Sequence, residues 1–374
     1  MLEVKLVNNK KMQKEFVEFP ISLYKDNPYF VPPLYADEMN VFTNKNVYND
    51  TCEHVYFLAY RDGVVVGRIS GIIQKDYNIK NNEKRARFTR FDAINDVVVA
   101  KVLFNAAENW AKSYGMDTIC GPLGFSDLER EGLLIDGFDY LSTFEEQYNY
   151  SYYQELIEAC GYEKDVDWVE YRLYNPKERN EKIKRIAELT MRKYNLTAEN
   201  GSGGKKAFVN KYKDHIFNVL DETYKHLYGT VPFTEGMKKQ ILDQFMLVIK
   251  PELVQVVADE NGRVIAFGLA IPGFGHVLQK SGGKLTLPTI IRLLKAVNKP
   301  KTLELGLIGV LPEYQATGVN AIILDYIMDI MIKYNIEYAE TNLNLETNTK
   351  VQSQWKYFDN IQHKKRRSFI KKLI

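Results

Sequence analysis

Apolar and polar side chains alternate along two stretches of the chain, residues 55–73 and 254–272. An Asp-Gly pair at 62–63 interrupts the first stretch, and an Asn-Gly pair at 261–262 interrupts the second. A period of two is typical of strands with one buried face, and these dipeptides favour the tight turns of β-hairpins. The pattern therefore predicts one hairpin in each half of the chain.

A period near 3.6 follows the hairpin in both halves. Residues 96–114 and 319–334 carry apolar side chains at helical spacing, and each helix ends near Gly115 or Asn335, residue types that tolerate the left-handed conformation after a helix. Strands are predicted next, and then shorter helices. The two halves thus share one order of elements, about 200 residues apart. The later elements are predicted at 117–121, 337–343, 152–160 and 350–358.

A boundary between two units is predicted near Pro176, which breaks an apolar strand and precedes a helix at 176–194. The predicted domains are residues 1–176 and 177–374. The order of elements indicates an α/β (α+β) fold made of one unit used twice. Each unit is expected to be a mixed, mostly antiparallel, twisted sheet flanked by helices.

Composition and charge change this picture little. Of the 374 residues, 45% are apolar and 26% are charged, as in ordinary globular proteins. The net charge of +2 gives no general field for nucleic acid or for an anionic membrane, so neither is expected as a partner. We interpret the basic run at 363–372 as a terminal strand with solvated cationic faces rather than as a nucleic-acid arm.

The cysteines and histidines do not suggest a redox or metal centre. The three cysteines lie far apart without a CxxC pair, and the five histidines include no HxH or HxxxH pair. We expect no disulfide framework and no metal site, and we interpret the cysteines as buried apolar residues. No signal-peptide pattern and no run of about 18 apolar residues is seen, so a reducing cytoplasm is expected.

Two glycine-containing loops are candidates for holding a phosphate. Residues 201–206, GSGGKK, lack P-loop spacing and are interpreted as an ordinary loop. Residues 312–321, PEYQATGVNA, join a predicted strand to a predicted helix, where unpaired N–H groups and the helix dipole favour an anion. Gly318 permits a positive φ or a close approach. The alternative is a plain turn with Thr317 near the helix N-cap.

The stretch from Val310 to Asn320, VLPEYQATGVN, resembles motif A of the GNAT acyltransferases, V-x-P-x-Y-[QR]-x-x-G-x-[GA]. The whole chain is similar to an uncharacterised bacterial group with tandem GNAT-like units, through KDNPYFVPPL, GPLGFSD, GLLIDGFD and LPEYQATG. The resemblance implies that residues 177–374 bind acetyl-CoA or another acyl-CoA. Asn320 replaces the family's Gly or Ala. The implied cofactor-binding residues are Ile308, Val310, Gln315, Ala316, Thr317, Gly318, Val319, Asn320, Ala321 and Asn348.

The corresponding loop of the first unit carries Asp92 and Asp96 and has no glycine. Aspartate favours the start of a helix but repels a diphosphate. Residues 1–176 are therefore expected to form a degenerate GNAT-like domain that lacks the CoA loop.

The resemblance also implies acyl transfer from the thioester to an amine. Backbone N–H groups near residues 308–311 are expected to face the thioester oxygen. Glu304 on the motif strand is the candidate base, and the alternative is a solvated strand carboxylate. Trp355 stands where the family often has a general-acid tyrosine. Tyr357 is the candidate acid, although a regular helix would turn it about 200° away from that position.

Three functions remain open at this point. The first is an acyl-CoA-dependent N-acyltransferase that acts on an unknown small-molecule amine or peptide bound between the units. The alternative is a non-catalytic GNAT-fold binding or regulatory protein, suggested by Asn320 and Trp355. The third is aminoacyl transfer from charged tRNA, against which the near-neutral charge argues. Aromatic segments at 148–153 and 226–233 are interpreted either as walls of a cleft between the units or as core and surface filling.

Overall fold

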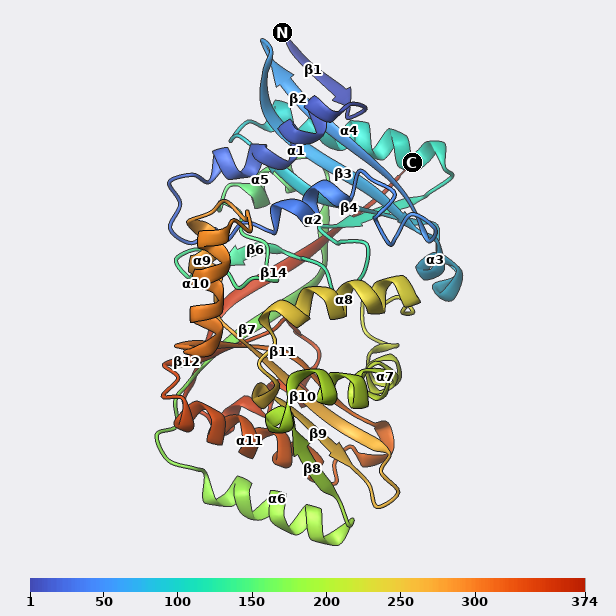
Figure 1. Cartoon of the computed structure of the whole chain (residues 1–374). Helices are drawn as coiled ribbons and strands as arrows, with labels where there is room; N and C mark the ends of the chain where they lie inside the picture. Colours follow the sequence, from blue (N-terminus) through green and yellow to red (C-terminus); the bar gives the residue numbers. More distant parts are fainter. Residues whose placement is uncertain (374) are drawn as a thin grey trace.

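One continuous sheet of fourteen strands runs through the computed structural model, which describes residues 1–373 (Figure 1). The strand order is β1-β2-β3-β4-β5-β14-β7-β12-β11-β10-β9-β8, with β6 paired to β14 and β13 paired to β7. The strands are β1 (Leu2–Leu6), β2 (Cys52–Arg61), β3 (Val64–Gln74), β4 (Arg85–Ala93), β5 (Thr118–Gly121), β6 (Leu133–Asp136), β7 (Glu163–Tyr174), β8 (Thr197–Asn200), β9 (Val254–Ala258), β10 (Val264–Pro272), β11 (Thr302–Val310), β12 (Tyr338–Thr341), β13 (Asn344–Leu345) and β14 (Asn360–Lys372).

Helices connect these strands and pack on the sheet. Among residues 1–373, no helix is long and apolar enough to cross a lipid bilayer. The α-helices are α1 (Lys10–Leu23), α2 (Tyr35–Asn40), α3 (Lys75–Asn81), α4 (Val97–Ser113), α5 (Tyr153–Glu158), α6 (Glu181–Lys193), α7 (Lys205–Tyr224), α8 (Glu235–Val248), α9 (Gly275–Gln279), α10 (Leu287–Asn298), α11 (Val319–Lys333) and α12 (Thr349–Gln352). The 3₁₀ turns are η1 (Gly201–Gly203), η2 (Pro251–Leu253), η3 (Pro312–Tyr314) and η4 (Trp355–Tyr357).

The repeated order of elements predicted from the sequence is confirmed. Each half contains an antiparallel hairpin, β2–β3 and β9–β10, and a parallel pair, β4–β5 and β11–β12. Both central residues of the first hairpin turn, Asp62 and Gly63, have positive φ, 49° and 81°, as the tight hairpin turn requires. The long helices α4 and α11 pack against these hairpins.

Helix ends differ from the sequence expectation where capping decides them. Helix α6 begins at Glu181 rather than at 176, because the side chain of Asn180 accepts the N–H groups of Lys182 and Ile183. The predicted helix at 350–358 splits into the short α12 and the 3₁₀ turn η4. The three cysteines are free and buried, as expected.

The last strand of the chain lies in the middle of the sheet. Strand β14 pairs with β5 on one side and with β7 on the other, and β7 in turn pairs with β12. Strand β14 from the second half thus completes the sheet of the first half, and β7 from the first half borders the sheet of the second. The sequence boundary near residue 176 falls in the loop after β7, but it does not divide the sheet.

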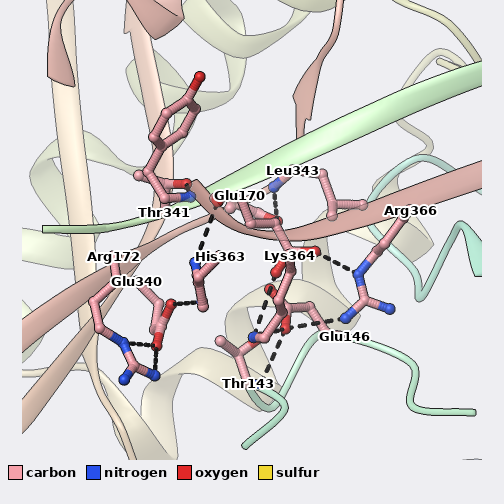
Figure 2. Close-up of polar contacts among 12 residues, drawn as sticks. Thr143, Glu146, Glu170, Arg172, Glu340, Thr341, Leu343, His363, Lys364 and Arg366 are labelled. Atoms are coloured by element: carbon pink, nitrogen blue, oxygen red, sulfur yellow. Dashed lines mark hydrogen bonds and ion pairs between the residues drawn. The ribbon is translucent and has the colours of Figure 1, made fainter. Parts of the chain in front are cut away.

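One of the two cationic faces of β14 is buried, whereas the sequence suggested that both are solvated. The side chains of Lys364 and Arg366 are 1% and 0% exposed, and they pair with the buried carboxylates of Glu146 and Glu170 (Figure 2). We call these four residues the ionic cluster. Lys364 Nζ lies 2.9 Å from Glu146 Oε2, and Arg366 Nε lies 2.5 Å from Glu170 Oε1. Burial makes such charges costly unless they are paired, and here the pairing joins β14 to β7 and to the loop before α5.

Candidate functional site

Strands β11 and β12 separate beside the motif loop. Their parallel pairing ends at Leu305 opposite Thr341, and the five residues of β11 that follow have no partner on β12. A cavity of about 740 Å³ opens here. Its lining includes Gly306, Leu307, Ile308, Gly309, Val310, Tyr314, Gln315, Ala316, Asn320, Asn342, Leu343, Asn344, Asn348 and Trp355, together with Tyr224, His226 and Leu227.

A bulge in β11 shapes the floor of this cavity. The register between β10 and β11 shifts between Leu269 and Ala270, so that Gly306 has no partner on β10. Asn342 closes the end of the β11–β12 pairing, because its N–H donates to Leu305 O and its side-chain amide donates to Gly306 O. Beyond this point the edge of β11 that faces β12 has no strand partner among residues 1–373, and Gly306 and Gly309 lie along this edge.

The motif loop brings unpaired N–H groups to the mouth of the cavity. Ala316 and Gly318 have positive φ values, 61° and 99°, and Gly318 precedes the first residue of α11. Within residues 1–373, the N–H groups of Ala316, Gly318, Val319 and Asn320 donate to no acceptor. Such groups at a helix N-terminus attract an anion. The phosphate interpretation of the sequence requires unpaired N–H groups of this kind.

Close packing explains the glycine in this loop. A Cβ on Gly318 would lie 2.6 Å from Thr190 Oγ1 on α6, and the positive φ adds strain for any other residue. Thr317 does not cap α11, because its hydroxyl donates to Tyr314 O at 2.6 Å. The loop thus packs against α6 on one side and borders the cavity on the other.

The predicted cofactor-binding residues divide into two groups. Six of the ten line the cavity, namely Ile308, Val310, Gln315, Ala316, Asn320 and Asn348, whereas Thr317, Gly318, Val319 and Ala321 do not. The side chains of Val319 and Ala321 are buried in the core, so these residues offer the ligand at most their main chain. Asn320 borders the open cavity and does not fill it. Asn348 also caps α12 by accepting the N–H of Val351.

The two predicted catalytic residues do not border the cavity. Glu304 is 8% exposed and accepts the N–H of Phe144 at 3.2 Å. Burial, with Glu145 and Glu146 nearby, raises the pKa of Glu304 well above its ordinary value. Tyr357 packs against the core of the second half. Trp355 does line the cavity and donates its indole N–H to Asn344. A catalytic role for Glu304 or Tyr357 has no support in this arrangement.

Two smaller cavities continue from the large one into the space between the halves. A cavity of about 150 Å³ shares Tyr224, Leu227, Gly306, Leu307, Asn342, Leu343 and Asn348 with it. A further cavity of about 170 Å³ shares Leu128, Glu129, Glu145, Ile241 and Gln244 with the second. The three cavities therefore adjoin in a row, from the motif loop to the region between α8 and the residues that follow α1.

The row of cavities changes in charge along its length. No Asp or Glu of the described residues lines the large cavity, whereas Lys350 and His226 do. Asp127, Glu129, Glu131 and Glu145 line the middle one. The large cavity is thus suited to a polyanion. Burial raises the pKa of all four acids in the middle cavity, so this cavity attracts a cation through those acids that are ionised.

Glu145 stands out among these carboxylates. Burial and the neighbouring Glu146 raise the pKa of Glu145 to about 7, although Arg130 opposes the shift. No described residue donates a hydrogen bond to its carboxylate, and it lines both smaller cavities. A carboxyl group that titrates near neutrality, in reach of a bound molecule, is suited to accept a proton. Burial likewise raises the pKa of Glu131 well above its ordinary range.

Tyr224 lies in the wall shared by the large and the middle cavity. Its hydroxyl donates to Ile308 O at 3.1 Å. Burial raises the pKa of Tyr224 to about 12, so the phenol keeps its proton at neutral pH.

Glu145 and Tyr224 were not identified from the sequence, because neither belongs to the motif. The aromatic segment at 226–233 did point to this region, because four of its residues, His226, Leu227, Tyr228 and Thr230, border these cavities.

The chain is similar to two bacterial proteins in sequence and to GNAT proteins in structure. No model of a known protein family matches the chain. Protein YghO of Escherichia coli is 27% identical over 353 residues, which cover 91% of this chain and 88% of that protein. A bacterial ceramide synthase of Caulobacter vibrioides is 26% identical over 312 residues, 81% of this chain and 79% of that one. Among solved structures, a tandem GNAT protein from the clavulanic acid biosynthesis pathway, 9% identical, matches 100% of this chain and 99% of its own with a TM-score of 0.57.

Proposed function

We propose that this chain, which has the tandem GNAT fold, is an acyl-CoA-dependent N-acyltransferase whose acceptor amine binds between its two halves. One observation carries the proposal: the large cavity, which no Asp or Glu among residues 1–373 lines, joins a smaller cavity lined by four acidic residues. A diphosphate and a protonated amine are the two ligands that such a pair of cavities separates by charge.

The large cavity fits the donor. Unpaired N–H groups at the start of α11 meet the requirement of a diphosphate, and the separated strands β11 and β12 leave room for an extended arm. Residues Gln315, Ala316 and Asn320 would hold the diphosphate, and the β11 backbone from Gly306 to Val310 would border the arm. When bound, acyl-CoA supplies an activated acyl group for transfer.

The residues of the shared wall supply the proton movements. An amine is protonated at neutral pH, since its pKa is near 10, and it must lose a proton before it can act as a nucleophile. Glu145 is placed to accept that proton, and Arg130 holds the loop behind it through a 2.7 Å hydrogen bond to Phe144 O. Tyr224 can donate a proton to a departing thiolate on the donor side. The aspartates of the first unit's loop have structural partners instead, because Asp96 caps α4 and pairs with Arg61, and Asp92 pairs with Arg68.

The acceptor we favour is a long-chain amino alcohol. One relative is named a ceramide synthase, and a ceramide is an amide of such an amine. The cavity of about 170 Å³ is lined by apolar side chains, by the acids Asp37, Glu38, Asp92, Glu129 and Glu145, and by the cations Arg68, Arg90 and Arg130. An amphipathic amine would place its tail against the apolar walls and its ammonium group near Glu145. The apolar lining includes Pro20, Phe30, Pro33, Leu34, Leu128, Met237 and Ile241.

Replacing Asn320 by aspartate tests the donor half. The exchange keeps the shape of the side chain but puts a negative charge beside the cavity at the start of α11. We expect the affinity for acetyl-CoA or a longer acyl-CoA to fall about tenfold or more, measured by isothermal titration calorimetry. Stability should not fall, since aspartate suits a helix N-terminus.

The matched control is Asn261→Asp in the exposed turn between β9 and β10, which changes the net charge equally. This control should bind acyl-CoA as the unaltered chain does. Absence of acyl-CoA binding to the unaltered chain would rule out the proposed function, and equal binding by both variants would place the diphosphate elsewhere.

The pH dependence of kcat/KM tests the acceptor half. Glu145 accepts a proton only when it is ionised, and its pKa is about 7. We therefore expect kcat/KM to rise with pH through about 7, and to rise further as the amine itself loses its proton. In Glu145→Gln the inflection near 7 should disappear while the later rise remains. An unchanged profile in that variant would remove Glu145 from the proton transfer.

A further inference from the structure

Helix α10 presents an apolar stripe to solvent. Leu287, Ile291 and Leu294 follow one another at helical spacing and are 72%, 60% and 44% exposed. At 100° per residue they fall within about 60° of each other around the helix. The opposite side of α10, with Thr289, Leu293 and Val297, is buried. Leu285, just before the helix, adds a fourth exposed apolar side chain, 39% exposed. We call the four exposed residues the α10 stripe.

The segment that carries this stripe contains cations and no acidic residue. Residues 264–303 contain no Asp or Glu and six Lys or Arg residues, all exposed. None of the six forms an ion pair with a described residue, although Lys284 lies over the ring of Tyr35. The net charge of +2 for the chain therefore conceals a local excess of positive charge. The six are Lys280, Lys284, Arg292, Lys295, Lys299 and Lys301.

We propose that the α10 stripe and its six flanking cations form a docking surface for an anionic lipid bilayer. An exposed apolar helix face bordered by Lys and Arg is the arrangement that rests in the plane of a membrane interface, where the apolar side chains enter the acyl region and the cations meet lipid phosphates. Figure 1 shows α9 and α10 along one flank of the molecule. The protein would be held at the surface of the bilayer, without spanning it.

A second copy of the chain fits this surface less well. Four side chains cover only part of the roughly 800 Å² per partner that a stable protein interface buries. A symmetric contact through α10 would also bring two sets of like charges together, because all six charged residues in the segment are cations. Charge complementarity therefore favours phosphate-bearing lipid as the occupant.

The docking surface adjoins the cavity of about 170 Å³ in which we place the tail of the acceptor. Gly283, in the loop before α10, accepts the N–H of Tyr35 at 3.0 Å, and a Cβ there would collide with Pro33 O. Pro33 and Leu34 line the cavity of about 170 Å³. A lipid amine in the bilayer would thus enter close to the point of attachment. This last step rests on the proposed function, whereas membrane docking does not.

Vesicle co-sedimentation tests the proposal without an activity assay. The full chain is mixed with phosphatidylcholine vesicles, with and without phosphatidylglycerol. We expect partitioning about tenfold stronger onto the phosphatidylglycerol vesicles, and a decline as salt screens the cations. The variants Leu287→Ser/Ile291→Ser/Leu294→Ser and Lys295→Gln/Lys299→Gln should each reduce partitioning about tenfold. Their thermal unfolding, followed by circular dichroism, reports whether the fold persists.

The matched control is Leu189→Ser on α6. This leucine is 53% exposed, within the range of the α10 stripe, but it lies outside residues 264–303. It should partition as the unaltered chain does. Equal partitioning onto both kinds of vesicle, or unchanged partitioning by both α10 variants, would overturn the proposal. So would a dimer in sedimentation velocity that the triple variant abolishes, because the stripe would then be covered by a second copy.

Discussion

Replacing Glu145 by glutamine is expected to lower kcat for acyl transfer by about 10²–10⁴-fold, the usual contribution of a positioned general base. Glutamine has nearly the same shape and cannot accept the proton of the amine. Glu145 does not line the large cavity, so acyl-CoA affinity should be unchanged. The measurement is release of free thiol from acyl-CoA in the presence of long-chain amino alcohols, with other primary amines as a wider set.

Glu155→Gln is the matched control, since this glutamate is exposed at the start of α5. Its kcat should equal that of the unaltered chain. Glu131 provides the contrasting variant, because it is also buried in the middle cavity with a raised pKa. A full rate in Glu145→Gln together with a lost rate in Glu131→Gln would contradict the assignment of the base, while leaving acyl transfer itself intact.

Replacing Lys364 by methionine is expected to lower the free energy of unfolding by about 3–5 kcal/mol, as when one partner of a buried ion pair is removed. Its side chain is 1% exposed, and its Nζ lies 2.9 Å from Glu146 Oε2 and 3.4 Å from Glu170 Oε2. Without it, Arg366 alone must balance two buried carboxylates. Urea unfolding at neutral pH, followed by circular dichroism, measures the loss.

Lys372→Met is the control in the same strand. This lysine is exposed at the end of β14, and no described residue forms an ion pair with it. Its replacement should change stability by no more than about 0.5 kcal/mol. Equal stability of the two variants would show that Lys364 is not an essential partner of the ionic cluster.

The elements of the fold were predictable because each depends on local sequence. Turn residues at 62–63 and 261–262 fixed the hairpins, and the apolar periods fixed α4 and α11 to within two residues. The motif loop could be located for the same reason. Its backbone needs positive φ values at Ala316 and Gly318, and small residues in the sequence indicate such a joint between a strand and a helix.

The neighbours of β14 were not predictable in the same way. A strand's alternation shows which face is buried, but not which strand lies beside it. The basic residues of 363–372 looked solvated because their partners, Glu146 and Glu170, lie about 200 residues earlier in the chain. The acidic side of the candidate site escaped prediction for a related reason: Glu145 borders the cavities only because the first half supplies a loop to the second.

The position of β14 also bears on biosynthesis. A ribosome delivers this strand after every other strand of the sheet, yet its place is between β5 and β7. Until then the nascent protein must carry two open edges in its centre, together with the unpaired acids Glu146 and Glu170. Exposed edges of this kind favour wrong associations. Chaperone dependence during synthesis, and failure of either half to fold when expressed alone, are the consequences to expect.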